Sequence, residues 1–62
     1  MTVLNIRGPQ GNAYCVMGNV QARMQADGSS KEAIDSVMAD MQSGDYDHLL
    51  DIAEQYIGII GR

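Results

Sequence analysis

Apolar residues alternate with polar ones along the 62-residue chain in a way that predicts a strand, three helices and a second strand. The first apolar group is Val3, Leu4 and Ile6, which favour a short, half-buried strand over residues 2–6. Gly8 and Pro9 then end the strand, because proline has no N–H to donate to a ladder and glycine allows a turn.

The first predicted helix runs from about Asn12, or a residue or two earlier, to Ala26. Asn12 is suited to the N-cap position and Gly28 to the C-terminal stop. Gly18 interrupts this helix, so we expect another helix or a symmetry-related chain to approach its backbone closely. The residues expected to be buried fall at helical spacing: Ala13, Val16, Met17, Val20 and Met24.

Two further helices follow. Ser29 and Glu32 have the spacing of a capping box that opens the second helix, which residues 43–44 close. Asp45 is the expected N-cap of the third helix, which should end near residues 54–55. The expected buried positions are Ile34, Val37, Met38 and Met41 in the second helix and Leu49, Leu50, Ala53, Tyr56 and Ile57 towards the end of the chain.

Residues 56–60 are rich in β-branched side chains, and Gly58 is a poor residue for a helix interior, so we predict a terminal strand. The expected fold is therefore a single α+β domain over residues 1–62, with the order β-α-α-α-β: mostly helical, with two short terminal strands. A two-stranded ribbon is weak by itself. We therefore expect it to pack closely on the helices or to pair between subunits.

The small size of the chain favours self-association. A domain of this length buries only about 60% of its unfolded surface and usually needs a disulfide, a metal or a partner. Cys15 is the only cysteine, so no intrachain disulfide can form, and no Cys/His cluster suggests structural zinc. A homodimer or larger homo-oligomer is the remaining common solution, and no cofactor is expected.

Charge is divided unevenly along the chain, whose net charge is −4. Residues 1–26 contain Arg7 and Arg23 and no acid (+2), whereas residues 27–62 contain all eight acids against Lys31 and Arg62 (−6). This acidic balance argues against binding long nucleic acids. With no signal peptide, no run of about 20 apolar residues and one free cysteine, we expect a cytoplasmic protein that does not enter a membrane.

The turn between the first strand and the first helix is the main candidate site. Backbone amides at a helix start bind anions, and the glycines of such a turn let a ligand approach. The sequence is neither a Walker A motif nor a dinucleotide-binding motif. The plain alternative is a turn that needs Gly, Pro and an N-cap for local structure alone. The predicted ligand-binding residues are Arg7, Gly8, Gln10, Gly11, Asn12, Ala13 and Tyr14.

Two further features have both a functional and a structural interpretation. Tyr14 lies off the buried stripe, so it could stack on a base beside the turn or pack against a neighbouring subunit. Asp45, Asp47, His48 and Asp51 cluster near the start of the third helix, where a metal or an acid–base pair is geometrically possible. Helix caps and carboxylates favoured by the helix dipole explain the same cluster more simply, so no metal-binding or catalytic residue is assigned.

Two motifs, Arg7-Gly8-Pro9-Gln10-Gly11-Asn12-Ala13 and Ser43-Gly44-Asp45-Tyr46-Asp47-His48-Leu49-Leu50, give the chain a resemblance to small proteins encoded by bacteriophages and prophages. The resemblance implies a phage setting in a host-cell cytoplasm, where such small proteins often counter host defence. Neither motif is tied to a reaction.

These observations lead to two hypotheses for function, neither of them enzymatic. In the first, a homo-oligomer binds and sequesters an anionic, nucleotide-like ligand at the turn. With only Arg7 and Arg23 in its basic part, the site should lie at or near an oligomer interface. In the alternative, the acidic second half inhibits a host defence complex by binding one of its proteins.

Overall fold

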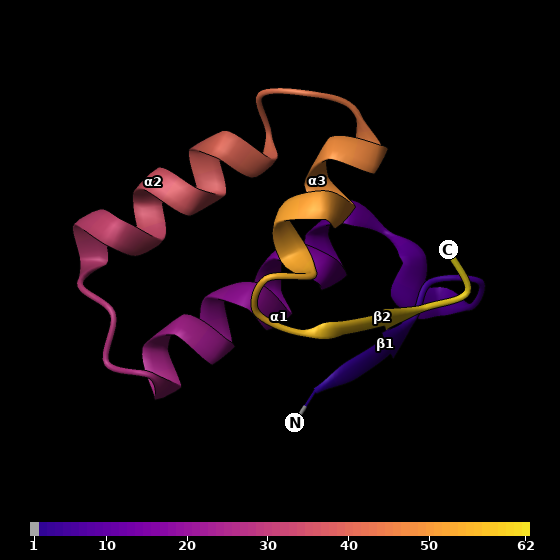
Figure 1. Ribbon diagram of the computed structural model, residues 1–62, viewed down its shortest axis with the longest axis horizontal. Helices are drawn as coiled ribbons and strands as arrows, with labels where there is room; N and C mark the ends of the chain where they lie inside the picture. The colour runs from indigo at the N-terminus through magenta and orange to yellow at the C-terminus, as the bar shows by residue number, and fades with distance from the viewer. Residues whose placement is uncertain (1) are drawn as a thin grey trace.

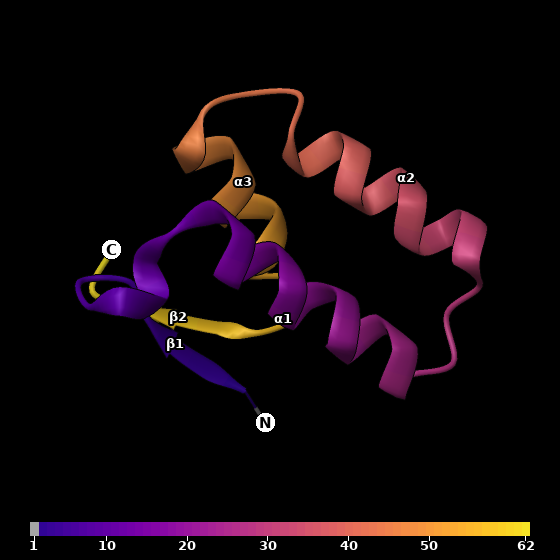
Figure 2. The same ribbon diagram turned by 180° about the vertical axis from the view of Figure 1, so that it is seen from behind.

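The computed structural model of the protein describes residues 2–62, and its elements follow the predicted β-α-α-α-β order. They are β1 (Val3–Asn5), a 3₁₀ turn η1 (Pro9–Gly11), α1 (Ala13–Ala26), α2 (Lys31–Met41), α3 (Tyr46–Ala53) and β2 (Gly58–Ile60). Figure 1 shows the two strands together at one side of the three helices, and Figure 2 gives the reverse view. None of the helices within residues 2–62 has the length and apolar character needed to cross a membrane.

The two terminal strands pair with each other in parallel, with Val3 opposite Gly58, Leu4 opposite Ile59 and Asn5 opposite Ile60. Further hydrogen bonds extend the pairing at both ends: Gly58 N–H donates to Thr2 O (2.8 Å), and Ile6 N–H donates to Ile60 O (3.1 Å). Leu4 is buried and Ile59 packs against the core. One face of the ribbon thus covers the helices, which is the close packing that so small a sheet needs.

The core is formed where the ribbon and all three helices meet. The predicted apolar stripes are confirmed, with Ala13, Met17, Val37, Met38 and Tyr56 only partly buried at the edge of the core. Sequence periodicity did not single out Ile52, which is also buried. The buried apolar residues are Leu4, Val16, Val20, Met24, Ile34, Met41, Leu49, Leu50, Ile52, Ala53 and Ile57.

Side chains cap the first and third helices as predicted. Asn12 Oδ1 accepts a hydrogen bond from Cys15 N–H (2.8 Å), and Asp45 Oδ1 accepts one from His48 N–H (2.9 Å). Each bond satisfies one of the N–H groups that a helix start leaves without a backbone partner. The boundaries of α1 and α3 therefore follow from single polar residues.

The predicted capping box at Ser29 is wrong by one residue. Ser30 is the N-cap of α2, and its Oγ accepts a hydrogen bond from Ala33 N–H (3.1 Å). Ser29 is already engaged in ending α1, because its N–H donates to Met24 O (2.9 Å) beyond Gly28. Gly28 has a φ of +80°, so the prediction that it stops α1 is confirmed.

The predicted close approach of another helix to Gly18 is also wrong. Gly18 is exposed, and a Cβ built there meets no atom of the described residues within 4 Å. Its neighbours on the buried stripe, Val16 and Val20, lie two residues away on either side. That spacing is close to half a helical turn, so Gly18 lies on the solvent side of α1.

Candidate functional site

Hydrogen bonds within the turn from Arg7 to Asn12 hold its polar side chains in place. Gln10 Oε1 accepts from Asn5 N–H (3.1 Å), and Asn12 Nδ2 donates to Pro9 O (3.0 Å). Gly11 N–H donates to Gly8 O (3.0 Å), which closes the 3₁₀ turn. Gln10 and Asn12, predicted to recognise a ligand, thus have a structural role in the turn.

Gly11 is required by the packing of the turn against the end of β1. A Cβ at this position would overlap the carbonyl oxygen of Ile6 and lie 2.8 Å from its carbonyl carbon. The Gly11 carbonyl also accepts a hydrogen bond from the hydroxyl of Tyr46, which lies far away in the sequence at the start of α3. The glycine therefore serves a close approach between backbone segments and anchors α3 to the turn.

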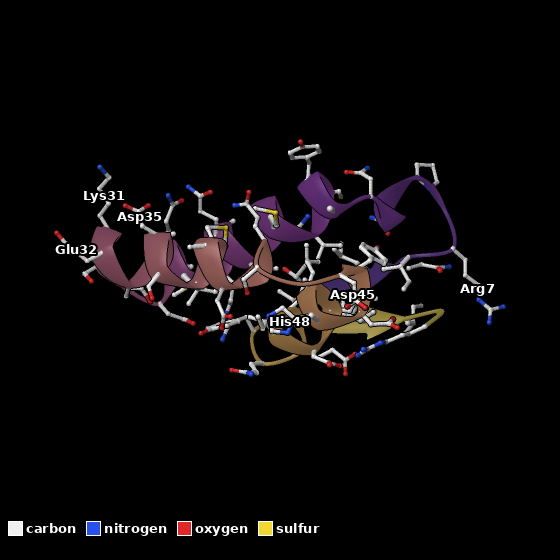
Figure 3. The ribbon with its side chains drawn as sticks, turned by 90° about the horizontal axis from the view of Figure 1, so that it is seen from above. Arg7, Lys31, Glu32, Asp35, Asp45 and His48 are labelled. Carbon is white, nitrogen blue, oxygen red and sulfur yellow. The ribbon has the colours of Figure 1, made fainter. Side chains whose placement is uncertain are left out.

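Arg7 is directed towards the end of the chain. Its Nε donates to Gly61 O (3.0 Å), and Figure 3 shows its guanidinium pointing outward from the end of the molecule. Gly8 is exposed, and a Cβ built on it would have no atom of residues 2–62 within 4 Å. Of the seven predicted ligand-binding residues, only Ala13 and Tyr14 line the hollow described next.

A hollow of about 350 Å³ lies where the start of α1 faces the turn between α2 and α3. We call it the Tyr14–Tyr46 hollow. Its floor is apolar because it is formed by Met41 and Leu49, which are almost completely buried. Tyr14 is 86% exposed and Tyr46 is 36% exposed. The residues that line it are Ala13, Tyr14, Met17, Met41, Gln42, Gly44, Asp45, Tyr46 and Leu49.

The composition of this hollow limits what it can bind. Within residues 2–62, Asp45 is the only charged residue that lines it. Tyrosine rings present a partly negative face, which attracts cations as well as apolar groups. The first backbone N–H groups of α1, at Ala13 and Tyr14, have no acceptor within the helix and attract negative charge. An apolar or aromatic group therefore fits the floor, while the rim favours a cation beside Asp45 or an anion beside Ala13.

A contact between Asp40, Ser43 and His48 joins the end of α2 to α3. His48 Nε2 lies 3.0 Å from Asp40 O, 3.3 Å from Asp40 Oδ1 and 3.3 Å from Ser43 Oγ. A catalytic triad needs the carboxylate and the serine on opposite nitrogens of the imidazole. Here both lie at the same nitrogen, and the Ser43 hydroxyl also donates to Asp40 O. The arrangement therefore fixes the α2–α3 turn and does not activate a nucleophile.

The predicted acidic cluster at the start of α3 is not brought together as a metal site. Asp45 caps the helix, and His48 Nε2 lies against the Asp40 carbonyl oxygen at the end of α2. Asp51 accepts a hydrogen bond from Arg62. Over residues 2–62, no three His, Cys, Asp or Glu side chains are arranged to hold a metal ion.

Arg62 secures the C-terminal residues against α3. Its guanidinium donates to the carboxylates of Asp51 and Glu54 and to the Asp47 carbonyl oxygen (3.1 Å). The hydrogen bond to Asp51, followed by that to Glu54, raises the pKa of Arg62. Because arginine already titrates well above neutral pH, the contribution of the Arg62 charge is present at neutral pH and is lost as strong alkali deprotonates the guanidinium.

The sequence predicted the α1 side of the hollow as a candidate site but not the side formed by α2 and α3. Ala13 and Tyr14 were candidates because they follow a recognisable turn. Tyr46 appeared only as part of a motif, and nothing in the motif shows that its hydroxyl reaches Gly11. Met41 and Leu49 were correctly predicted to be buried. That they form the floor of an open hollow depends on how α2 and α3 are joined.

Comparisons with protein families, with curated proteins and with solved structures give no match to this chain. The resemblance to phage-encoded proteins, and the function it implies, therefore remain predictions from two sequence motifs.

Proposed function

We propose that the protein is a non-catalytic binding module that holds an apolar or aromatic group of a basic protein segment in the Tyr14–Tyr46 hollow. The observation that carries the proposal is Tyr14, which is 86% exposed at the rim of the hollow. The hollow has an apolar floor, and among the described residues Asp45 is the only charged one that lines it. An exposed tyrosine beside a preformed hollow is typical of an interface anchor.

The charge of the surface supports a basic partner. Over residues 2–62, no ion pair engages Glu32, Asp35, Asp45 or Asp47. Few basic residues remain to balance these carboxylates, because two of the four, Arg23 and Arg62, are already paired with other carboxylates. Lysine or arginine residues flanking an inserted apolar side chain would meet a negative field and two tyrosine faces. The proposal is a form of the acidic-surface hypothesis drawn from the sequence, in which the partner contacts this hollow.

A nucleotide-like ligand is the second candidate, and one observation favours it. Tyr14 is exposed in the first turn of α1, so a base stacked on its ring could bring a phosphate towards the helix start. Asp45, on the same hollow, opposes the phosphate. If the protein is phage-encoded, as the two motifs suggest, either ligand is consistent with a role against host defence.

One substitution separates the two candidates. Serine is as good an N-cap as aspartate, so Asp45→Ser removes the charge at the hollow while keeping the cap of α3. Asp35→Ser is the matched control, because Asp35 is an exposed carboxylate on α2 that does not line the hollow. Tyr14→Ser tests the anchor, since so exposed a side chain contributes little to folding.

The assay is an NMR titration that follows the methyl signals of Met17 and Met41. The probes are peptides with a central leucine or tryptophan flanked by lysine and arginine, the same peptides with glutamate flanks, and a panel of linear and cyclic nucleotides. We expect the basic peptides to shift both methyl signals and Tyr14→Ser to weaken binding about tenfold, a typical loss for an interface anchor. We expect Asp45→Ser to weaken it about threefold, the scale of an exposed ion pair, and Asp35→Ser to change it less.

The outcomes are distinct. If nucleotides shift the two methyl signals and Asp45→Ser strengthens their binding, the second candidate replaces the first. If neither the basic peptides nor the nucleotides shift the methyl signals of the folded protein, both proposals are wrong.

A further inference from the structure

The outward face of the β1–β2 ribbon carries two exposed aliphatic side chains. Val3 is 50% exposed and Ile60 is 54% exposed, whereas Leu4 and Ile59, on the opposite face, pack into the core. Gly58 also faces outward: it lies opposite Val3 and two residues before Ile60 on β2. A Cβ built on Gly58 would approach Val3 Cγ2 to 3.0 Å. The side chain of Val3 thus packs over Gly58 from the β1 side. On the side of Gly58 away from β1, there is room for a side chain of a neighbouring strand.

The two edges of the ribbon differ. At the edge of β1, Asn5 N–H donates to Gln10 Oε1 (3.1 Å), and Asn5 O accepts a long hydrogen bond from Gly8 N–H (3.4 Å). The 3₁₀ turn therefore closes this edge at Asn5.

The edge of β2 is open. The bonds that join the strands use Gly58 and Ile60, so the N–H and C=O of Ile59 between them point away from β1. In the part of the chain that the structure describes, no hydrogen bond engages either group of Ile59. Figure 1 shows β2 with no other element drawn in front of it.

We propose that β2 pairs antiparallel with β2 of a second copy of the chain, about a two-fold axis at Ile59. The two Ile59 residues would then exchange both backbone hydrogen bonds, and Ile60 of each copy would lie opposite Gly58 of the other. In such a pair Ile60 fills the open side of Gly58 and meets Val3 across it. The register is self-complementary because the large residue and the glycine are both one position from the axis.

Charge and sheet size support a second copy as the occupant. Residues 2–6 and 55–61 contain no charged residue, although the chain carries a net charge of −4. Two acidic molecules can therefore approach at this edge without bringing carboxylates on the ribbon together. Pairing would turn a marginal two-stranded ribbon into a four-stranded sheet and would cover an edge that is otherwise open to other chains. The Tyr14–Tyr46 hollow involves neither strand, so this inference does not depend on the proposed function.

The test combines mass with amide exchange on the full chain. Sedimentation or light scattering from micromolar to millimolar concentration should show a shift from the 6.7 kDa monomer to a species of twice that mass. Hydrogen exchange of Ile59 N–H should slow as the dimer forms. Ile60→Lys should weaken the dimer about a hundredfold, because each of the two copies loses one apolar contact of about tenfold. Tyr14→Ser is the control and should leave the dimer intact.

Two outcomes would overturn the inference. The first is a chain that stays monomeric at millimolar concentration with Ile59 N–H exchanging as fast as at micromolar concentration. The second is a dimer that Ile60→Lys leaves unchanged and in which Ile59 N–H stays unprotected, since association would then use another surface. Because Ile60 is more than half exposed, circular dichroism should show that Ile60→Lys is folded.

Discussion

Replacing Gly11 with alanine tests whether this glycine serves the fold or a ligand. A methyl group there would overlap the Ile6 carbonyl oxygen and lie 2.8 Å from the carbonyl carbon and 3.2 Å from Cα. All three atoms belong to the backbone, so no side chain can rotate out of the way. The end of β1 and the 3₁₀ turn would have to separate.

The magnitude follows from what that separation disturbs. Overpacking costs about 1–3 kcal/mol. The hydrogen bonds from Gly11 N–H to Gly8 and from Asn5 N–H to Gln10 span the affected region and contribute about 1 kcal/mol each. We expect Gly11→Ala to lower the free energy of unfolding by about 3 kcal/mol, a large part of the total for so small a domain. The melting temperature should fall by about 12–24 °C, at about 4–8 °C for each kcal/mol.

Gly8→Ala is the matched control three residues earlier. Gly8 has an extended backbone (φ −104°, ψ −160°), and a Cβ there meets nothing within 4 Å. Thermal unfolding followed by circular dichroism should place Gly8→Ala within a few degrees of the wild type. Equal melting temperatures for Gly8→Ala and Gly11→Ala would contradict the predicted clash with the Ile6 backbone. The result also matters for function, because a ligand-binding defect in a Gly11 variant would report a disturbed turn and not a lost contact.

Urea unfolding of four other variants tests three further features: the α2 cap, the open position of Gly18 and the Tyr46 hydrogen bond. Ser30→Ala should lower stability by about 1 kcal/mol through loss of the α2 cap, whereas Ser29→Ala should cost less than about 0.5 kcal/mol; equal losses would contradict the assigned cap. Gly18→Ala should raise stability by about 0.5–1 kcal/mol, since its position on α1 is open. A decrease there would show that some element or second copy packs against it. Tyr46→Phe should cost about 1 kcal/mol by removing the hydrogen bond to Gly11 O, and an unchanged stability would refute that bond's contribution.

The helices could be predicted from the sequence because their signals are local. An N-cap such as Asn12 or Asp45 acts on a backbone N–H three residues away, and Gly28 ends α1 through its own backbone conformation. The cap of α2 was misplaced because Glu32 follows Ser29, and not Ser30, at the spacing of a capping box. The cap is Ser30, whose Oγ accepts from Ala33 N–H, while Ser29 N–H donates to Met24 O at the end of α1.

The site was less predictable because its two sides come from distant parts of the sequence. The polar residues of the turn looked free to bind a ligand. Gln10 instead meets the backbone of Asn5, and Gly11 is fixed by Ile6 and Tyr46. Of these contacts, the one between Tyr46 and Gly11 depends on where α3 lies relative to the turn. A motif that joins glycine, asparagine and glutamine can therefore serve a packing role as readily as a binding role.

The parallel pairing of the two chain ends has a consequence for the order of folding. Val3 and Gly58 are nearly a full chain length apart in sequence, whereas α1, α2 and α3 pack as consecutive neighbours. Closing so long a loop costs entropy before any strand contact forms. The helices should therefore assemble first and the ribbon last, so substitutions at Leu4 should change the unfolding rate more than the folding rate. The exposed edge of β2 would then be the last surface completed during folding and the first released during unfolding.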